Sequence, residues 1–231
     1  MDYLEQGLEK LELNSVRVVA LLTKYIEEIE LFNPAYGLVK VADHRELVVR
    51  HILDSLAPLC VIRGLLRGGS QKRKDNWRIA DVGSGAGLPG IPLAIGMDDA
   101  EFTLIERMGR RAGFLRNTLA LLDLPNVCVE EAEMERVAAK QGGSFDIVVF
   151  RAFRPLEGGI VKNLLGLLAP DGCMAAYKGR RSVIEEEMEN LFVKSGKDKG
   201  HVFGEWKIMP VEVPFLEEER HLLVINNGLV R

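Results

Sequence analysis

The sequence has few cysteines and no long apolar run. Its three cysteines, Cys60, Cys128 and Cys173, stand far apart among 231 residues. An odd number at wide spacing argues against a disulfide framework and against a metal site, and it predicts small buried thiols in a reducing compartment. No apolar run approaches the roughly 20 residues that cross a membrane, and the N-terminus has no signal-peptide pattern. We therefore expect a cytoplasmic protein without a metal.

The chain also lacks an excess of basic residues. Its formal net charge is −4, so the protein is not basic as a whole and a nucleic acid would have to bind local basic patches. With 47% hydrophobic and 28% charged residues, the chain can bury a sizeable core as one domain with an extension.

The most informative stretch, residues 77–95, begins as a short apolar strand and ends as an apolar helix. Between them, Gly83, Gly85, Gly87 and Gly90 leave almost no side-chain bulk. Glycine takes positive φ freely and lets a ligand lie against the backbone. The N-terminus of the following helix presents free N–H groups. This pattern predicts a nucleotide-type cofactor site at the mouth of a parallel α/β sheet.

Two acids and one leucine separate the possible cofactors. The dinucleotide fingerprint needs Gly or Ala as its sixth residue, and Leu88 stands there. Asp81 precedes the first glycine by two residues, where a carboxylate would repel a pyrophosphate but suits the cationic S-adenosylmethionine. Glu106 follows the next strand, a position from which an acid accepts hydrogen bonds from both ribose hydroxyls. The pattern therefore favours S-adenosylmethionine, with a tight turn beside an ordinary surface acid as the alternative.

Helices precede the first strand and predict an N-terminal cap. Their expected ranges are residues 2–12, a helix capped by Asn14 and ended by Asn33-Pro34, and a helix over 45–59. Residues 63–75 are expected to form a basic, glycine-containing loop. Residues 1–75 are thus predicted to be a helical cap with a basic loop, and residues 76–231 a cofactor-binding domain packed against it.

From Trp77 onward, strands and helices alternate, which predicts a parallel sheet. The expected strands are 77–82, 101–106, 127–130, 145–150 and 172–178, and the expected helices 88–96, 109–122, 133–140, 158–168 and 181–194. Residues 202–213 and 220–226 leave no room for a crossover helix and should pair as an antiparallel hairpin. The expected fold class is α/β, the Rossmann-like seven-stranded sheet of class I S-adenosylmethionine-dependent methyltransferases.

Several motifs occur together from the cap through the fifth strand. They are Val49–Leu56 (VRHILDSL), Asp81–Leu93 (DVGSGAGLPGIPL), Gly109–Leu115 (GRRAGFL), Phe145-Asp146 with Arg151-Ala152, and Lys178-Gly179. In this combination the chain resembles the bacterial glucose-inhibited division protein B family. Members of that family are guanine-N7 methyltransferases of 16S ribosomal RNA. The cap-helix motif together with the Gly-Leu-Pro-Gly-Ile-Pro-Leu turn is far more specific than the glycines alone.

The resemblance implies cofactor contacts at Gly83 and Leu88 and at Arg151 after the fourth strand. It places the adenine-side pair on Met134 and Glu135, where Glu133-Met134-Glu135 departs from the family's usual Arg-Ala-Glu. The complete set of candidate cofactor residues is Asp81, Gly83, Gly85, Leu88, Glu106, Met134, Glu135 and Arg151.

Guanine N7 is an in-ring lone pair with no proton to lose, so its methylation needs no general base and no catalytic side chain is predicted. Since side chains cannot read the major-groove edge of A-form RNA, the target nucleotide should be unpaired or locally opened. Its phosphates are expected to meet Lys72, Arg73, Lys74, Arg110, Arg111, Lys178, Arg180 and Arg181, with solvated charges as the alternative. For His51 and Asp54, one helical turn apart, a hydrogen bond that holds the cap to the core is favoured over catalysis.

The expected partner is 16S ribosomal RNA or the small-subunit particle, bound by a monomer. Three other functions stay open from the residues: a nicotinamide-dependent oxidoreductase, a non-catalytic RNA-binding module, and a methyltransferase of small molecules. Leu88 and the C-terminal hairpin count against the first, and the intact glycine turn with Glu106 counts against the second.

Overall fold

The computed structural model describes residues 2–69, 76–151, 156–194 and 204–227. In chain order the elements are α1 (Tyr3–Lys10), α2 (Val16–Tyr36), α3 (His44–Leu47), the π-helix η1 (Val48–Leu53), α4 (Asp54–Leu56), α5 (Leu59–Gly69), β1 (Trp77–Val82), α6 (Gly90–Gly96), β2 (Ala100–Ile105), α7 (Gly109–Leu122), β3 (Val127–Glu130), α8 (Met134–Gln141), β4 (Phe145–Arg151), α9 (Gly158–Leu167), β5 (Leu168–Lys178), α10 (Arg181–Lys194), β6 (Trp206–Val211) and β7 (Arg220–Asn226).

The strands form one seven-stranded sheet in the order β3-β2-β1-β4-β5-β7-β6. Strands β1 to β5 pair in parallel, and β7 pairs antiparallel with both β5 and β6, which confirms the predicted sheet and its hairpin. Strands β2 and β3 lie on one side of β1 and strand β4 lies on the other, so the strand order reverses next to β1. Ligands of open α/β sheets bind at such a switch point, beyond the carboxyl ends of the strands.

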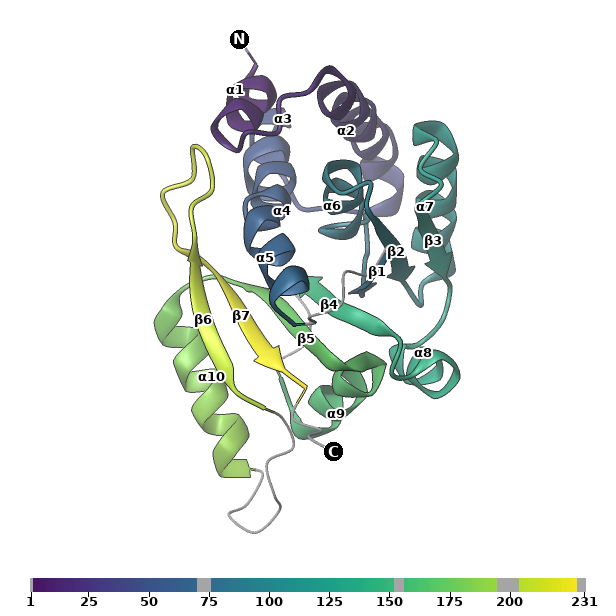
Figure 1. The fold of residues 1–231 in the computed structure, drawn as a ribbon. Helices are drawn as coiled ribbons and strands as arrows, with labels where there is room; N and C mark the ends of the chain where they lie inside the picture. Colours follow the sequence, from purple (N-terminus) through teal and green to yellow (C-terminus); the bar gives the residue numbers. More distant parts are fainter. Residues whose placement is uncertain (1, 70–75, 152–155, 195–203, 228–231) are drawn as a thin grey trace.

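Helices cover both faces of the sheet (Figure 1). Successive strand residues alternate between two hydrophobic clusters, because strand side chains point to opposite faces. Ile79 packs with the cap helices, α6 and α7, whereas Ala80 packs with α8, α9 and α10. The cap therefore shares its hydrophobic cluster with one face of the sheet.

The cap is joined to the sheet's first crossover by three long-range hydrogen bonds. Arg17 Nη1 donates to Ile95 O at 3.1 Å, and Arg63 Nη2 donates to Gly96 O at 2.8 Å, both at the end of α6. The buried hydroxyl of Tyr25 donates to Ala86 O in the glycine turn at 2.8 Å. The Tyr25 bond places α2 directly beside the glycine turn, and the two arginine bonds tie α2 and α5 to the C-terminal end of α6.

The predicted ends of the second helix are wrong. Ser15, not Asn14, caps α2, and its Oγ accepts a hydrogen bond from Val18 N at 3.3 Å. The helix also continues through Pro34 and ends at Tyr36, with Gly37 as its C-cap at a φ of +58°. Proline lacks only its own backbone N–H donor, so the helix can pass through Pro34 at the loss of one hydrogen bond. The chain leaves the helix at Gly37, because glycine can take the left-handed conformation.

The predictions for residues 45–59 and 63–75 are corrected as well. The first range is not one helix, because a π-helix, η1, separates α3 from α4. The second range is helical as far as Gly69, since α5 buries Ile62 and Leu66 in the core and this burial outweighs the helix-breaking glycines. Residues 70–75 lie outside the described residues. Strand β5 begins at Leu168 rather than at residue 172, because Leu168 pairs with Phe145.

Two of the three cysteines are not buried, contrary to the expectation. Cys173 lies in the core, but Cys60 on α5 and Cys128 on the edge strand β3 are exposed. Among the described residues, no helix combines the length and the apolar character needed to cross a membrane.

Candidate functional site

The turn between β1 and α6 is built from glycines in the left-handed region. The φ angles are +71° at Gly83, +60° at Gly85 and +96° at Gly87. At Gly87 a side chain has no room, since a Cβ would lie 2.5 Å from the Cδ1 atom of Ile91. At Gly85 the nearest atom to such a Cβ is the carbonyl oxygen of Gly83, 3.8 Å away. The turn thus packs tightly at Gly87 and leaves open space in front of Gly85.

Glu106, directly after β2, joins this turn to the next strand end. Its Oε2 accepts a hydrogen bond from Gly85 N at 2.9 Å, and its Oε1 accepts one from Met108 N at 2.8 Å. The residue is only 4% exposed, yet it lines a cavity. Its carboxylate is therefore held in one orientation, with lone pairs left over to accept hydrogen bonds from a ligand.

Asp81, at the carboxyl end of β1, lies beneath the turn. Its Oδ2 accepts a hydrogen bond from Gly90 N at 2.9 Å, whereas its Oδ1 has no hydrogen-bond partner. The side chain is completely buried, and burial raises the pKa of this carboxyl to about 7, against the opposing effect of Gly90, Ser84 and Arg151. Asp81 is not among the residues that line the two cavities described next.

Two cavities open at the carboxyl ends of the strands. The larger, of about 800 Å³, contains Glu106 together with Met134 and Glu135 from the start of α8. The smaller, of about 570 Å³, contains Gly85, Leu88 and Arg151. Gly83 and Arg111 line both cavities, which therefore adjoin at the glycine turn. Both volumes lie in the range of small-molecule sites.

The smaller cavity is rich in positive charge. Its basic side chains are Lys40, Arg50, Arg111, Arg151, Lys178 and Arg220, and its acidic ones are Glu46 and Asp54. Arg111, in the first turn of α7, is half-buried and makes no ion pair with any described residue. We expect this cavity to accept an anionic group, because a cleft lined mainly by one sign of charge attracts the opposite sign.

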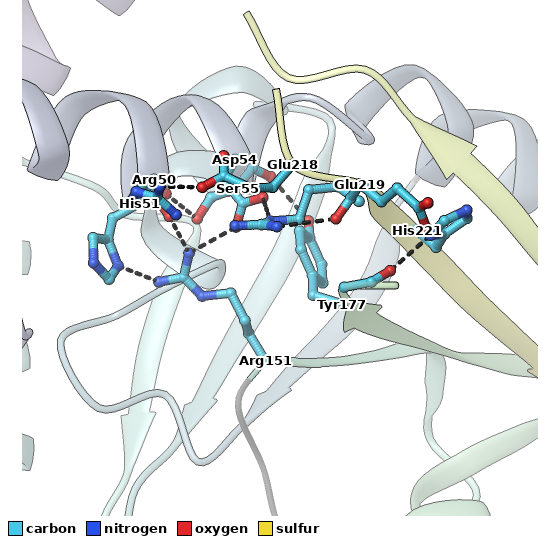
Figure 2. A network of polar contacts seen from close by, with 11 residues as sticks. Arg50, His51, Asp54, Ser55, Arg151, Tyr177, Glu218, Glu219 and His221 are labelled. Atoms are coloured by element: carbon cyan, nitrogen blue, oxygen red, sulfur yellow. Dashed lines mark hydrogen bonds and ion pairs between the residues drawn. The ribbon is translucent and has the colours of Figure 1, made fainter. Parts of the chain in front are cut away.

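Arg151 ends β4 and bonds to the cap (Figure 2). Its Nη1 lies 3.1 Å from Asp54 Oδ2, and its Nη2 lies 3.0 Å from His51 Nδ1. His51 and Asp54 thus hold the cap to the sheet through a third residue rather than by bonding to each other. Burial, and next the nearby Arg151 charge, lower the pKa of His51 to about 4. The imidazole is therefore neutral at pH 7, and its Nδ1 accepts a hydrogen bond from Arg151.

The predicted RNA-contacting residues do not form one track. Lys178 is largely neutralised, because its Nζ lies 2.6 Å from Glu187 Oε2 and both side chains are mostly buried. Arg181 pairs with Glu185 on the surface of α10, and Arg180 is exposed. Arg110 lies over the ring of Tyr36 at the edge of the larger cavity. The other candidates, Lys72, Arg73 and Lys74, lie outside the described residues.

Sequence reasoning missed Arg50 and Arg220 as cavity residues. Arg220 begins β7, whose antiparallel register sets His221 opposite Lys178 at the carboxyl end of β5. The predicted hairpin could have revealed this position, since the first residue of a returning antiparallel strand lies at the ligand-binding edge of the sheet. Arg50 stands in the cap-helix motif and in the π-helix η1, but no sequence signal placed its side chain at this cavity.

The amino-acid sequence matches a known protein family. The family model described as GidB, rRNA small subunit methyltransferase G, matches residues 2–204. The chain belongs to this family. This confirms the resemblance stated from the sequence motifs, and it sets aside the oxidoreductase alternative, because the family is one of methyltransferases.

Individual relatives in the rRNA small subunit methyltransferase G family cover nearly the whole chain. The protein of that name from Treponema denticola is 37% identical, over 96% of this chain and 92% of its own length. The protein of that name from Klebsiella pneumoniae strain 342 is 38% identical, over 89% of this chain and 87% of its own.

Solved structures agree on the fold. A putative S-adenosyl-L-methionine-dependent methyltransferase from Methanococcus maripaludis superimposes with a TM-score of 0.58 at 12% identity, covering 89% of this chain and 93% of that one. The fold predicted from the sequence, that of S-adenosylmethionine-dependent methyltransferases, is thereby confirmed.

Proposed function

We propose that this chain transfers a methyl group from S-adenosylmethionine to N7 of a guanine in the 16S RNA of the small ribosomal subunit. The observation that carries the proposal is the junction of the two cavities at Gly83 and Arg111. One cavity is bounded by the glycine turn and Glu106, and the other is lined by basic side chains. Family membership supports ribosomal RNA of the small subunit as the methyl acceptor.

The residues around the larger cavity suit the cofactor. Glu106 would accept hydrogen bonds from the ribose hydroxyls. The backbone of Gly83, which lines this cavity, and of Gly85, which lines the adjoining one, would lie against the ligand. Met134 and Glu135 would contact the adenine side. The partnerless Oδ1 of Asp81 lies below the turn, so this carboxyl would act through its field and through Gly90 rather than by direct contact. S-adenosylmethionine supplies the methyl group when it is bound there.

Leu88 and Arg151, two of the candidate cofactor residues, line the smaller cavity rather than the larger one, so we assign them to the side of the site that faces the guanine. The chain's task is to align guanine N7 with the methyl donor, since N7 carries no proton to be removed. Arg111, which makes no ion pair with a described residue, is the cation that we expect to meet a phosphate of the substrate. We expect Arg110, Arg180 and Arg181 to contribute weakly from outside.

A labelling experiment tests the proposal. The purified protein is incubated with methyl-labelled S-adenosylmethionine and small subunits from a strain that lacks the corresponding gene, and the RNA is digested to nucleosides. Label in 7-methylguanosine of 16S RNA is the expected result. Label in another nucleoside contradicts guanine N7 as the acceptor. RNA binding without transfer by the wild type would replace the proposal with a non-catalytic binding module.

Naked 16S RNA and assembled particles are compared in the same assay, which decides the form of the substrate. Calorimetric titration with S-adenosylhomocysteine and with NAD provides an independent check of the cofactor. Binding of S-adenosylhomocysteine alone is expected, and tight NAD binding contradicts the assignment.

A further inference from the structure

Asp54 divides its carboxylate between two arginines from different strands. Its Oδ2 is 3.1 Å from Nη1 of Arg151, the last residue of β4. Its Oδ1 is 3.0 Å from Nε of Arg220, the first residue of β7. Strands β4 and β7 lie on either side of β5, so one carboxylate from the cap spans three strands of the sheet.

All three side chains are withdrawn from solvent and line the smaller cavity. The exposed fraction is 7% for the side chain of Asp54, 15% for Arg151 and 23% for Arg220. Two guanidinium groups share one carboxylate, so the group keeps an excess of positive charge. A guanidinium has five N–H donors in a rigid plane, and fixing one edge of that plane also fixes the direction of its remaining donors.

The backbone around Asp54 is held just as firmly. Asp54 directly follows the π-helix η1, a type of helix that occurs frequently at functional sites. Ser55 Oγ donates to His51 O at 2.5 Å, and the buried Tyr177 hydroxyl donates to Ser55 O at 2.9 Å (Figure 2). The second bond ties this turn to β5, so the position of the Asp54 carboxylate is set by the sheet as well as by the cap.

We propose that Asp54 is a positioning residue for methyl transfer, which orients Arg151 and Arg220 on the wall of the cavity that receives the guanine nucleotide. This inference rests on the proposed function of that cavity. We assign Asp54 a role through these two arginines rather than through the reactants, since each of its oxygens bonds one guanidinium group. Its contribution is to keep two cations fixed beside the glycine turn, so that they do not rearrange when the nucleotide enters.

Steady-state kinetics of Asp54→Asn test the proposal, with methyl-labelled cofactor and small subunits as substrates. Asparagine keeps the size of the side chain but offers one acceptor where the carboxylate offers two. We expect kcat to fall between about tenfold and a hundredfold, while the Kd for S-adenosylhomocysteine changes by less than about twofold. Glu131→Gln, which removes an exposed partner of Arg116, is the matched control and should keep the wild-type kcat.

A double-mutant cycle separates positioning from folding. If Asp54 acts through Arg220, adding Arg220→Gln to Asp54→Asn should cost much less kcat than Arg220→Gln costs in the wild type. A lower unfolding temperature with wild-type kcat would show that Asp54 is only structural and would overturn the proposal. The proposal would also be overturned if the two substitutions lowered kcat independently, so that their separate effects multiplied in the double variant.

If Asp54→Asn does not fold, the kinetics of the single variant Arg220→Gln test the proposal. A fall in kcat at unchanged affinity for S-adenosylhomocysteine supports the proposal, and wild-type kcat overturns it. Failure of the proposed function looks different, since the wild-type protein itself would then transfer no label to 7-methylguanosine.

Discussion

Tyr25 and Ala86 are 61 residues apart in the sequence, and a buried hydrogen bond of 2.8 Å joins the Tyr25 hydroxyl in α2 to the Ala86 carbonyl in the glycine turn. The cap is thus bonded to the same turn that lies between the two cavities. Burial raises the pKa of Tyr25 well above its ordinary value, so the hydroxyl stays protonated and remains a donor.

We predict that Tyr25→Phe lowers the free energy of unfolding by about 1–3 kcal/mol, because the Ala86 carbonyl is left buried without its donor. Urea denaturation measures the change. Tyr3→Phe is the control, since Tyr3 lies at the surface and its ring contacts with Phe215 and Arg45 survive the substitution. Equal losses in the two variants would show that the hydroxyl bond to Ala86 contributes nothing specific.

Glu106→Ala should weaken S-adenosylhomocysteine binding by about 1–3 kcal/mol, the range for a lost hydrogen bond to a charged group. The substitution removes the carboxylate and frees Gly85 N and Met108 N, which it now holds. Isothermal calorimetry measures the affinity. Glu101→Ala, which removes an exposed acid on β2, should bind like the wild type. Unchanged affinity in Glu106→Ala would mean that the larger cavity is not the cofactor site.

Because of Asp81, the free energy of unfolding should depend on pH. Its pKa is raised from 3.8 to about 7 in the folded protein, so between pH 4 and 7 the native state binds a proton that the unfolded state has released. This contribution to stability is present at low pH and is lost as the pH rises towards 7. At about 1.4 kcal/mol per pKa unit, the loss amounts to a few kcal/mol.

We therefore expect Asp81→Asn to gain stability relative to the wild type as the pH rises from 5 to 8, because asparagine does not titrate. Urea denaturation of both proteins at the two pH values measures the difference. A stability difference that is the same at pH 5 and pH 8 would contradict the raised pKa.

Gly87→Ala should destabilise the fold by about 2–4 kcal/mol. The new methyl group would lie 2.5 Å from Ile91 Cδ1, and alanine is strained at a φ of +96°. Gly113→Ala is the opposite control, because that site inside α7 has no atom within 4 Å of the added Cβ. Alanine there should stabilise the helix by about 0.5–1 kcal/mol. Denaturation curves measure both changes, and a tolerated Gly87→Ala would show that the turn relaxes easily.

Local patterns determined most of the elements. The alternation of strands and helices placed β1, β3 and β4 within one residue of their observed bounds, and α7 without error. The position of Glu106 followed from the end of a strand in the same way. These features depend on hydrophobic period and on the torsional freedom of glycine, both of which can be read over short windows of sequence.

Local patterns could not predict the partners of charged groups, because those partners come from distant parts of the chain. Nothing near Asp54 indicates that it bonds Arg151, 97 residues away, and Arg220, 166 residues away. Nothing near Lys178 indicates that Glu187 on α10 neutralises it. The sequence by itself thus determined the sheet, the glycine turn and the family. Only the tertiary structure decided which cations face the cavity, because that depends on which strand ends and helices the topology brings together.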